Sequence, residues 1–232
     1  MKNILVIGGT SGIGFEIVSQ LQKENRVFYT GREEKSTETN KDSTFIPFDA
    51  TTDEHLDTSS LPESLEGLVY CPGSINLRPF KNIKLESFKA DLQVNLLGAI
   101  KSIQSVLPKL SASGQSSIVL FSTVAVQTGM PFHASVAAAK GAVEGLTRSL
   151  AAEFAPKIRV NAIAPSLVNT PLAEKFLNND VKMEKANARH PLGRIGTPAE
   201  IATAALFLLG NESAWMTGQI LRIDGGIGSL KT

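Results

Sequence analysis

Short apolar runs alternate with longer amphipathic stretches along the whole chain. The first run, residues 4–7, is continuous and ends at two glycines, which is typical of a parallel strand buried on both faces. Residues 13–21 follow with apolar side chains at helical spacing. We expect further strands at 26–32, 43–50, 65–73, 116–123, 157–165 and 218–226, and further helices at 88–107, 135–154 and 197–210.

Capping and turn residues mark the ends of these elements. Thr197 stands before a proline, as an N-cap does, and Gly210 is placed to end the same helix. Pro108 predicts the end of the helix at 88–107. Residues 33–42 have too few apolar side chains to pack as a helix, so we expect a surface loop there. The alternation predicts an α/β fold: a single-domain, Rossmann-type, doubly wound parallel sheet of about seven strands with helices on both faces.

Composition and charge exclude several classes of function. The 232 residues carry a formal net charge of +1 with no block of like charges, so neither nucleic acid nor a membrane is an expected partner. A single cysteine cannot form an internal disulfide, and with only three histidines no metal site is expected. The apolar run near the N-terminus is too short for a signal peptide or a membrane span, which predicts a cytoplasmic protein.

A glycine-rich turn joins the first strand to the first helix. Gly8, Gly12 and Gly14 follow the spacing G-x-x-x-G-x-G. Glycine allows the tight turn and the close approach of the backbone to a pyrophosphate, which then lies at the helix N-terminus. Such a match can also be only a turn, but its place between a first strand and a helix favours a dinucleotide site.

The end of the second strand bears on which dinucleotide would bind. NAD-binding sheets often have an acidic residue there, which binds the ribose 2′-hydroxyl. This chain has Gly31 and then Arg32, and a guanidinium suits a 2′-phosphate. We therefore expect NADP(H) in preference to NAD(H). The alternative is that Arg32 is a solvated loop charge, and Glu33 and Glu34 would oppose a phosphate if they faced it.

At this point the whole chain resembles the short-chain dehydrogenase/reductase family, most closely its 3-oxoacyl carrier-protein reductase-like members. The matching motifs are GGTSGIG (8–14), FDAT (48–51), VNLLGA (94–99) and RVNAIAPSLVNTP (159–171). The resemblance implies an oxidoreductase that acts on a carbonyl or acyl substrate and pairs through its two long helices as a homodimer or homotetramer. The cofactor-binding residues that it implies are Gly8, Thr10, Ser11, Gly12, Ile13, Gly14, Arg32, Asp49, Ala50, Gly73, Asn95, Lys140, Pro165, Val168 and Thr170.

The chain departs from the family in its catalytic set. Members use Asn, Ser, Tyr and Lys, with the last two spaced Tyr-x-x-x-Lys on one helix. Counting from Lys140 places Val136 at the tyrosine position and Thr123 at the serine position, whereas Asn95 is kept. A threonine hydroxyl still donates a hydrogen bond, but valine donates none. Losing a positioned general acid typically costs about 10²- to 10⁴-fold in rate.

Other residues near this position could supply the proton. His133 lies three residues before Val136, and histidine acts as an acid near neutral pH, although it could equally line the entrance or be solvated. Ser135 is expected as the N-cap of the helix. Lys140 also binds the nicotinamide ribose in the family, so its presence fits cofactor binding without turnover. His190 and His55 are expected on the surface or in loops.

Two hypotheses of function follow. The first is an NADP(H)-dependent reductase that uses Thr123, Asn95, Lys140 and either His133 or water in place of the phenol. The second is a protein that binds NADP(H) without turnover, as a sensor or as the inactive subunit of a hetero-oligomeric reductase. A third explanation is that Val136 is an introduced change. The substrate cannot be inferred, but residues 172–190 correspond to the family's lid over the substrate.

Overall fold

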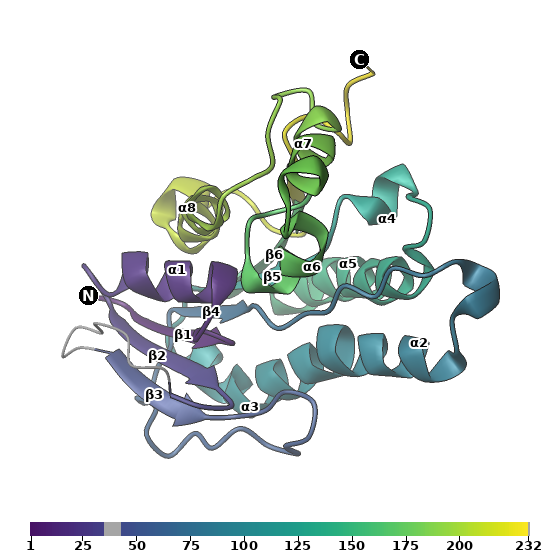
Figure 1. The fold of residues 1–232 in the computed structure, drawn as a ribbon. Helices are drawn as coiled ribbons and strands as arrows, with labels where there is room; N and C mark the ends of the chain where they lie inside the picture. Colours follow the sequence, from purple (N-terminus) through teal and green to yellow (C-terminus); the bar gives the residue numbers. More distant parts are fainter. Residues whose placement is uncertain (35–42, 232) are drawn as a thin grey trace.

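One sheet of seven parallel strands organises the molecule. The computed structural model describes residues 1–34 and 43–231. The strand order is β3-β2-β1-β4-β5-β6-β7, so the direction of winding reverses beside β1 (Figure 1). This confirms the predicted fold class. The strands are β1 (Asn3–Ile7), β2 (Arg26–Gly31), β3 (Ser43–Pro47), β4 (Gly67–Tyr70), β5 (Ser116–Phe121), β6 (Ile158–Pro165) and β7 (Ile220–Ile223).

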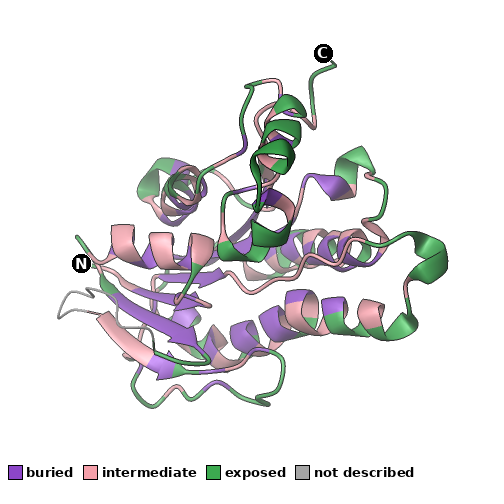
Figure 2. Cartoon of the chain, viewed as in Figure 1, coloured by how far each residue is buried: buried purple, intermediate pink, exposed green. Residues whose placement is uncertain are grey.

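Helices cover both faces of the sheet and make two separate cores. On one face α1 (Gly12–Leu21) packs beside α8 (Pro198–Leu209), and on the other lie α3 (Gly98–Ala112) and α5 (Ala134–Phe154) (Figure 1). Successive strand residues point to opposite faces, so β1 contributes to both cores. Strands β1, β2, β4 and β5 are therefore buried on both sides, as the purple colour of the central strands in Figure 2 shows, and their continuous apolar runs follow from that, whereas the edge strands β3 and β7 are mostly half-buried.

The helix expected at 88–107 is longer and less regular than its sequence pattern. It consists of α2 (Leu85–Leu92), a π-helical turn (Gln93–Leu97) and α3, and Pro108 lies inside α3 instead of ending it. Pro108 is on the exposed side of α3, where water can satisfy the backbone carbonyl that the proline leaves without a donor. On the sheet-facing side of α3, Leu110 lies one turn after the buried Val106 and is itself fully buried. Its burial favours continuing the helix past Pro108.

The start of α5 also differs from expectation. The helix begins at Ala134, so His133 takes the N-cap position that was expected for Ser135. The Ser135 side chain is buried, and its hydroxyl has no hydrogen-bond partner among the described residues.

The remaining segments are short helices and loops. They include α4 (Ala125–Thr128), α6 (Glu174–Leu177) and α7 (Asp180–Ala188), of which the last two rise above the carboxyl ends of the strands (Figure 1). Most of the loop predicted at 33–42 lies outside the described residues. Within the ranges that the structure describes, no helix is both long and apolar enough to cross a membrane.

The capping box of α8 allows a test of this local structure. Thr197 Oγ1 accepts a hydrogen bond from the Glu200 backbone N–H at 3.4 Å, and Glu200 Oε2 accepts one from the Thr197 backbone N–H at 2.8 Å. Thr197→Ala should lower the free energy of unfolding by about 1 kcal/mol, measured by urea denaturation. Thr203→Ala on the exposed face of the same helix is the control and should change it by less than about 0.5 kcal/mol. Equal losses in the two variants would contradict the capping role.

Candidate active site

Two adjoining cavities open at the carboxyl ends of the central strands. The first, of about 440 Å³, is lined by the glycine-rich turn and the ends of β2 and β3, and we call it the glycine-side cavity. The second, of about 510 Å³, lies under α6 and α7, and we call it the lid-side cavity. They share Ile13, Cys71, Gly73, Thr170 and Leu172, so together they form one continuous crevice.

The sequence-predicted site residues are brought together around this crevice. The glycine-side cavity is lined by Gly8, Thr10, Ser11, Gly12, Ile13, Gly14, Arg32, Asp49, Ala50, Gly73 and Thr170. The lid-side cavity adds Thr123, His133, Lys140, Pro165 and Val168. Asn95 lies behind the shared wall, against Gly73. Residues separated by as many as 160 positions in the chain thus meet at one edge of the sheet.

The glycine-rich turn is shaped so that only glycine fits at its key positions. Gly8 has φ +76°, and a Cβ built on Gly14 would lie 2.1 Å from the Gly8 carbonyl oxygen. Ser11, the N-cap of α1, makes no side-chain capping bond, so the first N–H groups of this ten-residue helix face the cavity without that partner. The turn therefore fits a pyrophosphate at the N-terminus of α1.

At the far end of the glycine-side cavity lie two residues of opposite charge, Asp49 and Arg32. The Asp49 carboxylate accepts hydrogen bonds from Thr51 N at 2.8 Å and Thr51 Oγ1 at 2.6 Å. These bonds, and to a smaller extent the nearby Arg32 charge, lower the pKa of Asp49 below its usual value. Arg32 is exposed and lines the same cavity, so its guanidinium is accessible to an anion there.

Asn95 and Lys140 converge where the two cavities meet. A methyl group built on Gly73 would lie 3.3 Å from Asn95 Oδ1 and 3.5 Å from Lys140 Nζ, so both atoms face one small space. Asn95 lies in the π-helical turn, and its amide donates to the Asp91 carbonyl at 2.8 Å and to Ser74 Oγ at 2.9 Å. Its Oδ1 is buried without a described partner, which leaves an acceptor for a ligand or a water.

Asp91 is a residue of the site that the sequence did not single out. Its side chain is fully buried, and Oδ1 accepts from Ser74 Oγ at 2.5 Å and from Asn76 Nδ2 at 2.7 Å. The negative charge of Asp91 also interacts electrostatically with the Lys140 ammonium, and Lys140 is 7% exposed. Burial lowers the pKa of Lys140 to about 8, and the negative charge of Asp91 opposes that shift. In the sequence, the only feature that could have indicated Asp91 is its place four residues before Asn95. An acidic residue on a solvent-exposed helix face gives the same spacing, so the feature is not specific.

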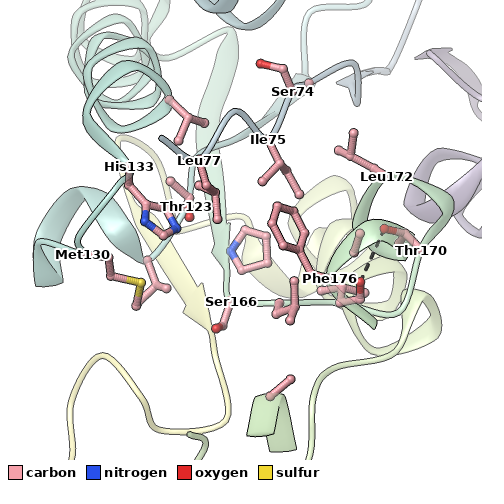
Figure 3. Close-up of a pocket in the computed structure, with 18 of the residues that line it drawn as sticks. Ser74, Ile75, Leu77, Thr123, Met130, His133, Ser166, Thr170, Leu172 and Phe176 are labelled. Carbon is pink, nitrogen blue, oxygen red and sulfur yellow. Dashed lines mark hydrogen bonds between the residues drawn. The ribbon is translucent and has the colours of Figure 1, made fainter. Parts of the chain in front are cut away.

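An apolar side chain, Val136, occupies the position at which the family resemblance predicts a catalytic phenol. Val136 is 5% exposed and lines the lid-side cavity with Thr123. Thr123 Oγ1 accepts a weak bond from the Ala125 N–H at 3.3 Å, which leaves its own proton free to donate. His133 Nδ1 lies 2.7 Å from the Pro131 carbonyl, so Nδ1 carries the proton and Nε2 is available to the cavity. Figure 3 shows His133 and Thr123 at the same side of the cavity.

The chain's tyrosines and its cysteine are unsuited to replace that phenol. Tyr29 is buried in the core, and the buried Tyr70 hydroxyl donates to the Val94 carbonyl at 2.6 Å. Burial raises the pKa of Tyr70 and raises that of the Cys71 thiol to about 12, so both stay protonated. No tyrosine is among the described residues that line either cavity, and the described chain contains no cluster of three metal-ligating side chains.

His190 corrects an expectation from the sequence. It was expected on the surface or in a loop; it does lie in the bend after α7, but it is 5% exposed and lines the lid-side cavity. Its Nδ1 lies 2.8 Å from the Ala186 carbonyl, which fixes the proton on Nδ1, and its Nε2 then accepts from Ser166 Oγ at 2.8 Å. Ser166 follows Pro165 at the end of β6. The pair therefore connects the end of α7 to the sheet.

The ionisation of Lys140 gives a direct test of this buried cluster. In the ligand-free protein the Lys140 ammonium should titrate near pH 8 instead of its ordinary value near 10.5, as followed by NMR of labelled lysine side chains. Asp91→Asn removes a negative charge that favours the ammonium, so the midpoint should fall further. Circular dichroism would confirm that the variant is folded. A Lys140 midpoint near 10.5, or one unmoved by Asp91→Asn, would contradict the described coupling.

Comparison with known proteins agrees with this geometry. A family model described as enoyl-(acyl carrier protein) reductase matches residues 8–228. A 3-oxoacyl-[acyl-carrier-protein] reductase of Thermotoga maritima is 41% identical over 146 residues, which span 62% of this chain and 58% of that protein. An inactive 2-(S)-hydroxypropyl-CoM dehydrogenase of Xanthobacter autotrophicus is 35% identical over 171 residues, 72% of this chain and 74% of that one.

Solved structures extend the likeness over the full chain. ElxO with NADP bound superposes with a TM-score of 0.90 at 27% sequence identity, covering 99% of this chain and 100% of ElxO. The parallel sheet, the glycine-rich turn after β1 and the whole-length family match lead to one conclusion. The chain belongs to the short-chain dehydrogenase/reductase family of NAD(P)-binding oxidoreductases.

Proposed function

We propose that the protein is an NADP(H)-dependent reductase of a carbonyl substrate whose proton donor is not a tyrosine. The observation that carries this proposal is that Asn95 and Lys140 meet beside Gly73, at the junction of the two cavities, while Thr123 lines the lid-side cavity together with Lys140. A site kept only for binding would have no need of a hydroxyl donor in the lid-side cavity. The substrate is a small molecule that occupies this second cavity.

The glycine-side cavity is the proposed cofactor site. The N-terminus of α1 holds the pyrophosphate, Asp49 and Ala50 contact the adenine, and Arg32 binds the 2′-phosphate of NADP(H) in preference to NAD(H). Pro165, Val168 and Thr170 hold the nicotinamide end, and Lys140 and Asn95 bind near the ribose. Bound NADPH supplies the hydride. The NADP in the related ElxO structure supports the choice of cofactor.

Lys140 is the proposed source of the proton. Its lowered pKa, about 8, makes the ammonium a much better acid than an ordinary lysine, and its Nζ faces the space beside Gly73. Thr123 donates a hydrogen bond to the carbonyl oxygen, where negative charge develops. Asn95 fixes the position of Ser74 by donating a hydrogen bond to its Oγ. His133 is the alternative donor in its imidazolium form, in which Nε2 also carries a proton, and its ring lines the same cavity.

A second candidate function is an NADP(H)-binding protein without turnover, either as a sensor or as a silent subunit beside a competent reductase. It is favoured by the apolar Val136 at the proton-donor position, and by the likeness to a relative whose name describes it as inactive. For either function we propose pairing of copies through α3 and α5, as homodimer or homotetramer, with a hetero-oligomer as the form of the silent subunit.

Replacing Arg32 tests the cofactor preference. Arg32→Gln should weaken NADPH binding by about 10- to 100-fold, the loss expected for one charged hydrogen-bond partner, and should leave NADH binding nearly unchanged. Both dissociation constants would be measured by fluorescence titration. NADH serves as the internal control because it lacks the 2′-phosphate. An equal loss for both dinucleotides would show that Arg32 does not recognise that phosphate.

Restoring the phenol separates the two candidate functions. Val136→Tyr should raise the rate of carbonyl reduction by about 10²- to 10⁴-fold, because it adds a positioned acid four residues before Lys140. Val136→Phe is the matched control for size and should add no such gain. Rates of NADPH oxidation would be measured on a panel of ketones and oxoacyl thioesters. Measurable wild-type turnover that Lys140→Met abolishes supports the reductase; turnover only in Val136→Tyr supports the silent protein.

A further inference from the structure

The mouth of the lid-side cavity carries an unbalanced positive charge. Lys175 on α6, Lys182 and Lys185 on α7, and Arg189 at the end of α7 all line it. Not one aspartate or glutamate is among the described residues that line the same cavity. A chain with 23 basic and 22 acidic side chains would give a mixed lining by chance, so the segregation calls for an explanation.

The charge on α7 is divided between its two faces. Lys182, Lys185 and Arg189 are spaced i, i+3, i+7, which places them on one side of the helix, toward the cavity. Asp180 and Glu184 line a separate surface hollow with Asn187 and Gly193. Both signs are thus present on one short helix, but only the positive one faces the cavity.

Among the residues that the structure describes, these cations have no carboxylate partner. Lys175 Nζ donates to the Ile75 carbonyl at 2.8 Å, and Lys182 Nζ donates to the Lys175 carbonyl at 3.0 Å and to Asn178 Oδ1 at 2.8 Å. These partners position the ammonium groups but do not neutralise them. Across residues 1–34 and 43–231 the only ion pairs are Arg148–Glu144 and Arg194–Glu200, both away from this mouth.

The interior of the same cavity is apolar. Ile75, Leu77, Met130, Leu167 and Phe176 line it, and Figure 3 shows several of these side chains around the central space. The buried Lys140 lies at the junction with the glycine-side cavity, and the half-buried Thr123 lines the lid-side cavity with it. A molecule that fills this space therefore meets three zones in order: cations at the mouth, apolar walls, and the groups that would act on a carbonyl.

We propose that the substrate is an anionic carbonyl compound, with an apolar body and a carboxylate or phosphate at the end farthest from the carbonyl. This inference rests on the proposed function for the reacting group, but the anion site itself rests only on the charges at the mouth. Because the four cations are exposed, they attract the anion through solvent and confer preference more than high affinity.

Binding to the full chain saturated with NADP⁺ tests this without requiring turnover. The ligands are a medium-chain keto acid, its neutral methyl ester, and the phosphate monoester of the matching keto alcohol, each titrated by calorimetry at low salt. The acid or the phosphate should bind about tenfold more tightly than the ester, and the advantage should shrink as salt is added. The tighter of the two anions identifies the end group.

Two variants complete the test. In a Lys182→Gln, Lys185→Gln, Arg189→Gln triple variant the anions should bind no better than the ester, while the affinity for the ester and for NADP⁺ stays as in the wild type. Glu184→Gln, on the opposite face of α7, is the matched control and should retain the full preference. Equal binding of ester and anions in the wild type would overturn the proposal, as would a preference that survives in the triple variant.

The outcomes separate this inference from the proposed function. An anion that binds with the expected preference but is never reduced supports the anion site and contradicts the reductase. Reduction of the neutral ester as efficient as that of the acid supports the reductase and overturns the anion site. Binding only of an acyl carrier-protein thioester, with no small anion bound, would also overturn it.

Discussion

The reversal of strand order beside β1 is the constraint on which the site depends. In a parallel sheet every strand ends at the same edge, and here β2 and β3 extend to one side of β1 while β4 to β7 extend to the other. The chain after β1 and the chain after β4 must therefore diverge, and a crevice opens between them. This brings Gly8, Gly73, Thr123 and Pro165 together from four distant segments.

Burial of charge at this crevice then determines its chemistry. The family resemblance predicts a tyrosine at position 136, but the chain has Val136 there, which cannot ionise. The desolvation that Lys140 itself experiences lowers its own pKa to about 8, while the buried Asp91 keeps the ammonium from being lost entirely. Ser74 and Asn76 hold Asp91 in turn, so the acid strength of Lys140 depends on a network that extends onto α2.

Much of this could be predicted from the sequence, because local patterns carry the information. Buried parallel strands leave continuous apolar runs, the glycine-rich turn has a fixed spacing, and the N-cap of α8 is marked by Thr197 before a proline. Tertiary burial is not local in this way. Asp91 and His190 look like solvated residues until their neighbours are placed, and the bond of Ser166 to His190 joins residues 24 positions apart. Pro108 ended the predicted helix because its exposed position on α3 could not be foreseen.

The central claim is that the Lys140 ammonium supplies the proton that a phenol supplies elsewhere in the family. The most direct measurement is the pH dependence of the single-turnover rate of carbonyl reduction at saturating NADPH. The account predicts a rate that falls as the pH rises through about 8, where the ammonium is lost, and a midpoint that moves to lower pH in Asp91→Asn. A rate that does not change with pH across this range would contradict the account. So would a midpoint that Asp91→Asn leaves in place.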